Sequence, residues 1–209
     1  AREKVVALLG SEPREIIFTS CGTESNNAAI HSALATNPGK RHVITTAVEH
    51  SANIKYGKFL EQKQGVEVTW LPVESDGSLD LCALATSIRP DTAIVSIMWA
   101  NNETGVIFPI EEISAICRSK GVTFHTDAVQ TPGKLAIDVN ALGVDMLPIS
   151  AHKLHAPQGI GALYVRRGTK FQPFIMGGGQ ERGQRAGTEN VPYMVGFGRA
   201  AELALEHLH

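Results

Sequence analysis

Short apolar segments alternate with segments of helical periodicity along most of this chain. In "IEEISAICRSKG", Ile110, Ile113, Ile116 and Cys117 recur at helical spacing, and Gly121 supplies a stop signal. Other segments are short and rich in β-branched residues, as strands are. These predicted strands span 15–20, 42–48, 66–73, 92–100, 122–129, 144–150 and 160–165. Strands separated by helices favour a largely parallel sheet, so the pattern predicts an α/β domain.

One stretch departs from this alternation. In "VDMLPISAHKLHAPQGIGALYV" the strands at 144–150 and 160–165 follow each other without a helix, which predicts a hairpin and one antiparallel strand. There is no internal repeat or low-complexity linker, so we expect one domain. Both ends of the chain lie within helical patterns, so we expect these residues to be the central part of a longer protein. The helix expected at 191–208 is apolar on one side, as a core or dimer contact would be.

Composition describes an ordinary globular protein. The 209 residues are 43% apolar and 19% charged, and the net charge of −2 lacks the basic footprint of a nucleic-acid partner. No apolar segment approaches the length of a membrane span and no signal segment opens the chain, so we expect a cytoplasmic protein. Cys21, Cys82 and Cys117 are widely spaced, which argues against a zinc site or a disulfide framework.

Polar clusters follow several predicted strands, where ligands of α/β proteins bind. After the first strand, Gly22 and Thr23 of "SCGTESNN" open a helix whose free amides could cradle a phosphate, although Thr would also serve as a plain cap. His50 follows the second strand and could be catalytic or structural. After the fourth strand, Asn101 and Asn102 suit a tight turn, but they also offer donors to a carboxylate.

The next two strands end in groups of opposite charge. Asp127 lies at the end of the fifth strand, where it could cap the following segment or balance a cationic ring nitrogen. Lys153 follows the sixth, beside Ser150 and His152. A partly desolvated lysine has a disfavoured ammonium form and a more nucleophilic amine. An amine, a phosphate cradle and an aspartate in this order suit pyridoxal phosphate, whose protonated ring accepts the electrons of a substrate carbanion.

The motifs resemble those of a known family. "SCGTESNN", "VEH", "WANNETGV", "HTDAVQTPGK", "SAHKLHAPQGIGALYVRRG" and "GGGQERGQRAGTENVP" are similar in order and spacing to cysteine desulfurases of the nitrogen-fixation type, in the class V aminotransferase family. The resemblance implies the large domain of a type I pyridoxal phosphate enzyme. That fold has a mostly parallel seven-stranded sheet with helices on both faces, and it forms a homodimer. Residues 1–209 would be a single cofactor-binding domain.

The resemblance implies a role for each matched residue around the cofactor ring. Lys153 would bond covalently to the cofactor aldehyde and act in catalysis. Asp127 would hold the ring nitrogen and Gln130 the ring hydroxyl. His50 would stack on the ring and assist proton transfer. Asn102 would lie near the substrate carboxylate.

The phosphate is assigned to a second set of matched residues. Thr23, Ser150 and His152 would bind it within the same subunit, and Thr188 of "RAGTEN" would reach the phosphate of the other subunit. In "SAHK" the family's glycine is replaced by Ala151, which is less permissive of unusual backbone angles.

The implied reaction converts L-cysteine to L-alanine and transfers sulfur to an enzyme cysteine as a persulfide, for an iron–sulfur assembly scaffold or another acceptor protein. The family's N-terminal arm and C-terminal small domain, which carries the sulfur-attacking cysteine, are absent from these residues. Cys21 is a poor substitute, because it lies in the phosphate segment. Alternatives are another type I lyase or aminotransferase, or a cofactor-binding domain without turnover.

Two further patterns carry less weight. His152 and His155 have metal-pair spacing, but Lys153 lies between them and no carboxylate ligand is matched, so we expect no metal. The glycines of "GGGQERGQRAG", with Arg182 and Arg185, suit a mobile segment at a subunit boundary.

Overall fold

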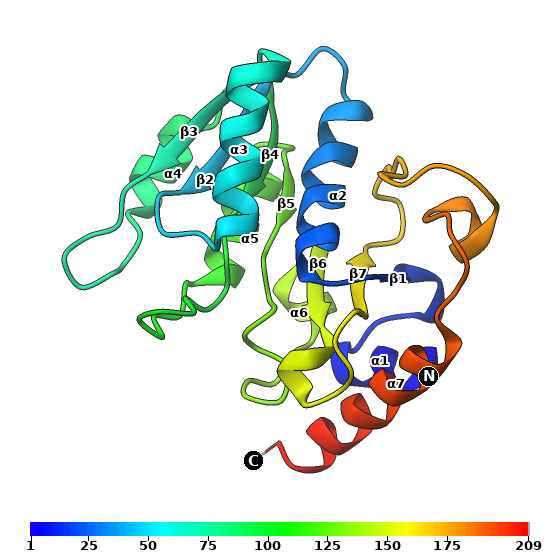
Figure 1. Ribbon diagram of the computed structural model, residues 1–209. Helices are drawn as coiled ribbons and strands as arrows, with labels where there is room; N and C mark the ends of the chain where they lie inside the picture. Colours follow the sequence, from blue (N-terminus) through cyan, green and yellow to red (C-terminus); the bar gives the residue numbers. More distant parts are fainter. Residues whose placement is uncertain (209) are drawn as a thin grey trace.

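A seven-stranded sheet forms the centre of the molecule in the computed structural model, which describes residues 1–208 (Figure 1). The strands lie in the order β1-β7-β6-β5-β4-β2-β3. Their bounds are β1 Ile16–Thr19, β2 His42–Thr46, β3 Glu67–Leu71, β4 Thr92–Ser96, β5 Thr123–His125, β6 Met146–Ser150 and β7 Gly161–Val165. Every strand predicted from the sequence is present, and the expected seven-stranded sheet is confirmed.

The sheet is mostly parallel. Strands β2 to β6 pair in parallel, whereas β7 runs antiparallel to β6 and to β1. The β6–β7 pair extends from Met146↔Val165 to Ser150↔Gly161, which confirms the predicted hairpin. Strand β5 is shorter than the predicted 122–129: it ends at His125, and Asp127 lies in the loop that follows, where Val129 N bonds to Asp127 Oδ1.

Helices cover both faces of the sheet, as predicted. Helices α2 Gly22–Ala35 and α3 Ser51–Gln64 lie on one face. The other face carries α1 Arg2–Leu9, α4 Leu81–Ser87, α5 Ile110–Ser119, α6 Val139–Leu142 and α7 Val191–Glu206. Short 3₁₀ turns occur at η1 Pro13–Glu15, η2 Ala151–Leu154 and η3 Gln180–Gly183.

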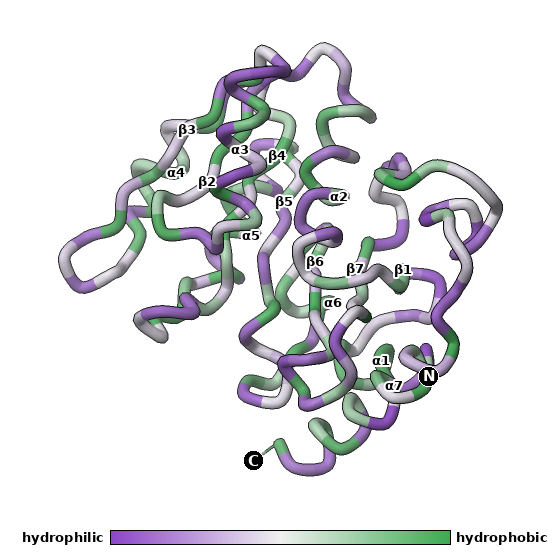
Figure 2. Tube along the Cα trace, viewed as in Figure 1, coloured by the Kyte–Doolittle hydropathy of each residue, from purple (hydrophilic) through white to green (hydrophobic). Residues whose placement is uncertain are grey.

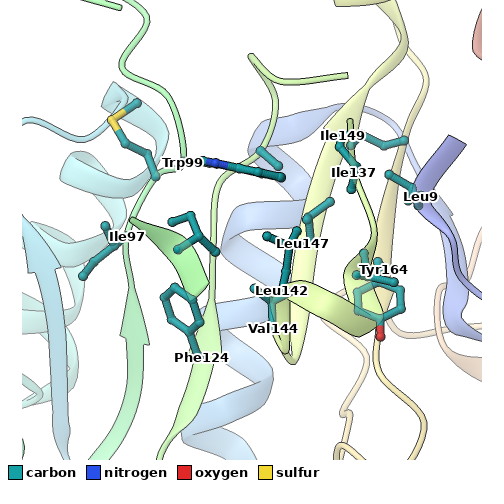
Figure 3. Close-up of a cluster of buried hydrophobic side chains, with 14 of the residues drawn as sticks. Leu9, Ile97, Trp99, Phe124, Ile137, Leu142, Val144, Leu147, Ile149 and Tyr164 are labelled. Carbon is teal, nitrogen blue, oxygen red and sulfur yellow. The ribbon is translucent and has the colours of Figure 1, made fainter. Parts of the chain in front are cut away.

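Neighbouring side chains of a strand contribute to two separate cores, one on each face of the sheet. In β2, Ile44 joins the cluster beneath α1, α5 and α7, and Val43 joins the cluster beneath α2 and α3. Figure 3 shows part of the larger cluster, in which Leu9, Phe124 and Leu147 come from different elements and are at most 1% exposed. Burying one such side chain contributes about 1.5–3 kcal/mol. In Figure 2 green and purple alternate along α2, as expected of a helix with an apolar side against the sheet and a polar side facing away.

Two chain ends pack together on one side of the sheet. Helix α1 lies against α7, where a Cβ on Gly198 would approach Ala1 Cα to 2.6 Å. Phe197 and Ala201 of α7 are fully buried, which confirms the core-facing side predicted for this helix. The helix ends at Glu206 rather than continuing to 208. Across residues 1–208, every helix is too short or too polar to span a bilayer.

The order of the strands creates a crevice. From β2 the chain adds β3 on one side and then places β4 on the other side, so the direction of winding reverses between β2 and β4. The loops that leave two such strands turn away from each other at the carboxyl edge, and ligands bind in the gap between them. The candidate site lies at this edge.

Candidate functional site

A cavity of about 250 Å³ opens at the carboxyl edge of the sheet. It is lined by segments that follow β1, β2, β4, β5 and β6. Its residues are Cys21, Gly22, Thr23, Asn26, His50, Met98, Asn102, Asp127, Val129, Gln130, Ser150, His152 and Lys153. Every site residue predicted from the sequence lies here except Thr188, which lines a separate depression with Ser20, Arg185 and Asn190.

The start of α2 forms one wall of the cavity. Its N-cap is Cys21, whose side chain makes no hydrogen bond to the helix. The first intrahelical bond runs from Ser25 N to Cys21 O at 3.2 Å. The amides of Gly22, Thr23 and the following residue therefore have no acceptor within the helix. Free amides at a helix start bind anions, which fits the phosphate cradle predicted from the sequence.

Glu24 supports this helix start from the side. Its Oε2 accepts a bond of 2.8 Å from Ser20 N, and Arg185 donates to both carboxylate oxygens at 2.8 and 3.0 Å. Burial alone would raise the pKa of Glu24, but the hydrogen bonds from Arg185 and Ser20 outweigh burial and lower the pKa. The carboxylate is thus ionised and tied to Arg185, so the helix amides remain available to a ligand.

Asp127 is buried at the floor of the cavity. Asn26 Nδ2 donates to its Oδ2 at 2.7 Å, and Val129 N donates to its Oδ1 at 2.9 Å. Burial raises the pKa of Asp127, while these hydrogen bonds and the electrostatic influence of His50 and Lys153 oppose that shift. A carboxylate that is 5% exposed and faces a cavity is suited to bind a cation.

Lys153 lies in η2, directly after β6, where it is half-buried. Next to it, Ser150 Oγ and His152 Nδ1 are 2.9 Å apart. Burial and the charge of Lys153 lower the pKa of His152, which favours the neutral imidazole. The backbone φ of Ala151 is not positive, so alanine in place of the family's glycine introduces no left-handed strain here.

His50 and the asparagine pair complete the rim. His50 caps α3, and its Nδ1 accepts from Ala52 N at 3.1 Å, which places the proton of the neutral ring on Nε2. Asn101 forms the turn: its Oδ1 accepts from Glu103 N and Thr104 N, each at 2.9 Å. Asn102 is exposed and lines the cavity. Each of the two interpretations of this pair therefore applies to one residue: Asn101 shapes the turn, and Asn102 faces the cavity.

Gln130 also faces the cavity, and Lys134 Nζ lies near its side-chain oxygen at 3.3 Å. Two residues that the sequence analysis missed belong to this region. Asn26 stands four positions after Gly22, so helical spacing from the phosphate motif was a usable signal. Glu49 is buried directly before His50, and its adjacency to that histidine was the only signal.

The residues present fit pyridoxal phosphate. The start of α2 offers unpaired amides to a phosphate, Asp127 offers a buried negative charge to a ring nitrogen, and Lys153 offers an amine to an aldehyde. In residues 1–208, no group of three or more His, Cys, Asp or Glu side chains could hold a metal ion. Larger cavities exist, but they do not combine these groups. One of about 550 Å³, at the start of β5, is lined by Arg118, Asp145 and Arg166.

The cysteines differ in their surroundings. Cys117 is buried in α5, where burial raises the pKa of its thiol to about 12. Cys82 is exposed on α4. Only Cys21 reaches the cavity among the described residues, and it lies at the helix start that fits the phosphate.

The glycine-rich segment 176–188 is anchored to the edge of the sheet. Glu181 Oε2 accepts from Phe18 N at 2.9 Å, and Arg182 donates to Ile16 O at 2.7 Å. Arg185 is bound to Glu24 of α2, so both arginines link this segment to the sheet and to that helix. These bonds also use the free edge of β1, which would otherwise be open to another strand. The mobility expected for this segment stays a prediction.

The chain is similar to proteins of known name. Residues 1–209 match the family "Aminotransferase class-V". The chain is 59% identical to "Cysteine desulfurase 2" of Trichormus variabilis and 52% identical to "Cysteine desulfurase NifS" of Azotobacter vinelandii, covering all of this chain and 52% of each relative. The chain therefore spans about half the length of these curated relatives.

Solved structures give the same picture. A protein described as "NIFS-LIKE PROTEIN" has a TM-score of 0.94 and 46% identity, over 98% of this chain and 57% of that one. A second, "SspA in complex with cysteine", has a TM-score of 0.92 and 42% identity, over 96% of this chain and 58% of that one.

Proposed function

We propose, from the premise that the chain belongs to the class-V aminotransferase family, that it is the cofactor-binding large domain of a pyridoxal phosphate-dependent cysteine desulfurase. The membership confirms the family resemblance predicted from the motifs. Enzymes of this family use pyridoxal phosphate. The observation that carries the proposal is the convergence of Lys153, Asp127 and the amides of α2 on one cavity.

Bound pyridoxal phosphate would supply an electron-accepting ring that stabilises negative charge on a substrate carbon. The residues of this chain would provide binding and orientation. The amides of α2, with Thr23, Ser150 and His152, would hold the phosphate. Asp127 would hold the ring nitrogen in its protonated form, because a buried carboxylate is stabilised by a cation at contact distance.

We assign proton transfer to two residues that line the cavity. Lys153 would hold the cofactor through its aldehyde, and its free amine would carry a proton at Nζ. His50 carries its proton on Nε2, because Nδ1 already accepts from the backbone of α3. Gln130 would contact the ring hydroxyl and Asn102 the substrate carboxylate.

L-Cysteine is the proposed substrate, since the matched relatives are named cysteine desulfurases and one structural neighbour is described with cysteine bound. The sulfur would pass to a cysteine outside residues 1–209, because Cys21 lies at the proposed phosphate site. The whole protein would then release alanine and deliver persulfide sulfur to an acceptor or scaffold protein for iron–sulfur assembly. We propose a cytoplasmic homodimer in which Thr188 reaches the partner's phosphate.

The test uses the full-length protein with pyridoxal phosphate, L-cysteine and a thiol reductant. Sulfide and alanine should appear in equal amounts, and Lys153→Ala should abolish both. Amino-group transfer to a keto acid without sulfide would instead identify an aminotransferase. Cofactor binding without any turnover of cysteine would contradict the proposed activity while retaining the binding function.

A further inference from the structure

A buried carboxyl group joins three elements next to the cavity. Glu49 is 7% exposed. Its Oε1 accepts from Thr46 Oγ1 at 2.8 Å and from Met98 N at 2.9 Å, and its Oε2 accepts from Asn53 Nδ2 at 3.1 Å. One side chain thus connects the end of β2, the continuation of β4 and the first turn of α3.

Glu49 lies at the position where β2 and β4 separate. Their pairing ends at Thr45↔Ser96, and beyond it Ala47 N bonds to Leu71 O of β3 at 2.9 Å. The β4 continuation has therefore lost its backbone partner on the β2 side. The carboxylate of Glu49 replaces the missing carbonyl by accepting from Met98 N. This is the gap produced by the reversed winding of the sheet.

The opposite side of the same segment is tied to the floor of the site. Trp99 N bonds to Asp127 O at 2.9 Å. The segment 97–99 is thus held between Glu49 on one side and the backbone of Asp127 on the other. A second tie, from Asn101 Nδ2 to Val48 O at 3.0 Å, crosses the same gap.

Two residues that line the cavity depend on this arrangement. His50 is the next residue after Glu49, and Met98 is bound to it through the backbone amide. Glu49 itself does not line the cavity. Its hydrogen bonds therefore fix the positions of the His50 ring and the Met98 side chain without contact with a ligand.

We propose that Glu49 is a positioning residue of the candidate site: by holding the ends of β2 and β4 and the start of α3 together, it places His50 and Met98 against the bound ligand. The inference rests on the proposed function, because the ligand it concerns is pyridoxal phosphate. Removing the carboxyl group should weaken cofactor binding even where the fold survives.

The surroundings of Glu49 determine how readily its carboxyl group ionises. Burial raises its pKa to about 7, the three hydrogen bonds oppose that shift, and the charge of Asp127 adds to it. Thr46 and Asn53, from the other packed elements, are neutral donors. A cation bound against Asp127 would offset the negative charge there and favour ionised Glu49, which is the better acceptor for all three donors.

Glu49→Gln keeps the size of the side chain and its ability to form hydrogen bonds, whereas Glu49→Ala removes both. Glutamine can still accept from Thr46 and Met98 through its oxygen. Its amide can donate to Asn53 Oδ1, which has no partner in the structure as described, if the Asn53 amide rotates. Alanine removes all three hydrogen bonds.

Glu15 provides a matched control. It is also a buried glutamate, 7% exposed, and it accepts backbone hydrogen bonds from Arg167 N at 2.8 Å and Glu12 N at 2.9 Å. It lies before β1 and does not line the cavity. Glu15→Ala should therefore reduce stability without changing cofactor binding.

The measurement is the dissociation constant of pyridoxal phosphate for the full-length apo-protein, followed by absorbance, with thermal unfolding in parallel. Glu49→Ala should raise the constant by at least about tenfold, whereas Glu49→Gln and Glu15→Ala should stay within about threefold of the natural protein. Unchanged affinity in Glu49→Ala, or an equal loss in Glu15→Ala, would overturn the inference.

If Glu49→Ala does not fold, a second variant tests the same inference. Thr46→Val removes one hydrogen bond to Glu49 and keeps the shape of the side chain. It should raise the dissociation constant by more than about threefold, and a constant within about threefold of the natural protein would overturn the inference. Failure of the natural protein to bind the cofactor would instead contradict the proposed function, so the two failures are distinguishable.

Discussion

Asn26, in the second turn of α2, donates a 2.7 Å hydrogen bond from Nδ2 to Oδ2 of Asp127, in the loop that follows β5. The bond links the helix that would hold the phosphate to the carboxylate that would hold the ring nitrogen. Both groups are buried, so the bond also fixes the distance between the two halves of the site. The cavity is thereby preorganised before any ligand enters.

We expect Asn26→Ala to lower stability by about 1–3 kcal/mol, since it leaves a buried carboxylate with one hydrogen bond fewer. It should also weaken pyridoxal phosphate binding. Asn27→Ala is the control, because Asn27 makes no side-chain hydrogen bond within residues 1–208. Urea unfolding and a cofactor titration of both variants check this, and equal effects of the two would contradict it.

Gly22 of α2 lies so close to the loop after β5 that a side chain there would meet Val129. A Cβ there would lie 2.7 Å from Val129 Cγ2, and Val129 lines the cavity. Gly22→Ala should therefore displace Val129 and weaken cofactor binding.

A double variant tests that explanation. Val129→Ala removes the clashing methyl groups, so Gly22→Ala should cost less affinity in the Val129→Ala background than alone. The coupling is read from cofactor dissociation constants of the four proteins. Additive losses would show that the contact with Val129 is not the cause.

The Glu24–Arg185 pair should make stability depend on pH in the acid range. The pKa of Glu24 is lowered in the folded protein, so the contribution of the pair is present above the ordinary value of 4.5 and is lost as pH falls through the folded value. Arg185→Met should cost about 1 kcal/mol at pH 7 and less at pH 3.5. Urea unfolding at both pH values checks this, and a pH-independent cost would contradict it.

Ionisation of Glu49 should make the protein less stable as pH rises towards neutral, which is opposite to the effect of Glu24. Its folded pKa is raised from 4.5 to about 7, so the natural protein loses stability as pH rises between these values. The loss is on the order of 3 kcal/mol above pH 7, because each pKa unit corresponds to about 1.4 kcal/mol. Glu49→Gln cannot ionise, so its unfolding free energy relative to the natural protein should increase from pH 5 to pH 8. A constant difference would contradict the shifted titration.

Much of this arrangement could be predicted from the sequence. The strands were visible because β-branched runs such as 92–100 contrast with the helical spacing of Ile110, Ile113 and Cys117. The convergence of His50, Asp127 and Lys153 followed because parallel strands bring their carboxyl ends to one edge of the sheet.

The supporting contacts could not be predicted in the same way. The Asn26–Asp127 bond joins residues 101 positions apart, and it exists only because α2 packs across β5 and β6. Glu49 stands in a polar loop and gives no sign of burial; its partner Met98 N is free only because β2 and β4 diverge. The anchoring of Arg182 likewise depends on the exposed edge of β1, which the order of strands creates.

The central claim is that Lys153 Nζ bonds to the aldehyde of pyridoxal phosphate. The most direct measurement is intact mass and peptide mapping after borohydride reduction of the full-length protein with cofactor, alongside Lys153→Ala and the exposed control Lys58→Ala. The account predicts one reduced cofactor per chain, attached at Lys153, in the natural protein and Lys58→Ala and none in Lys153→Ala. A cofactor attached to another lysine, or retained in Lys153→Ala, would contradict it.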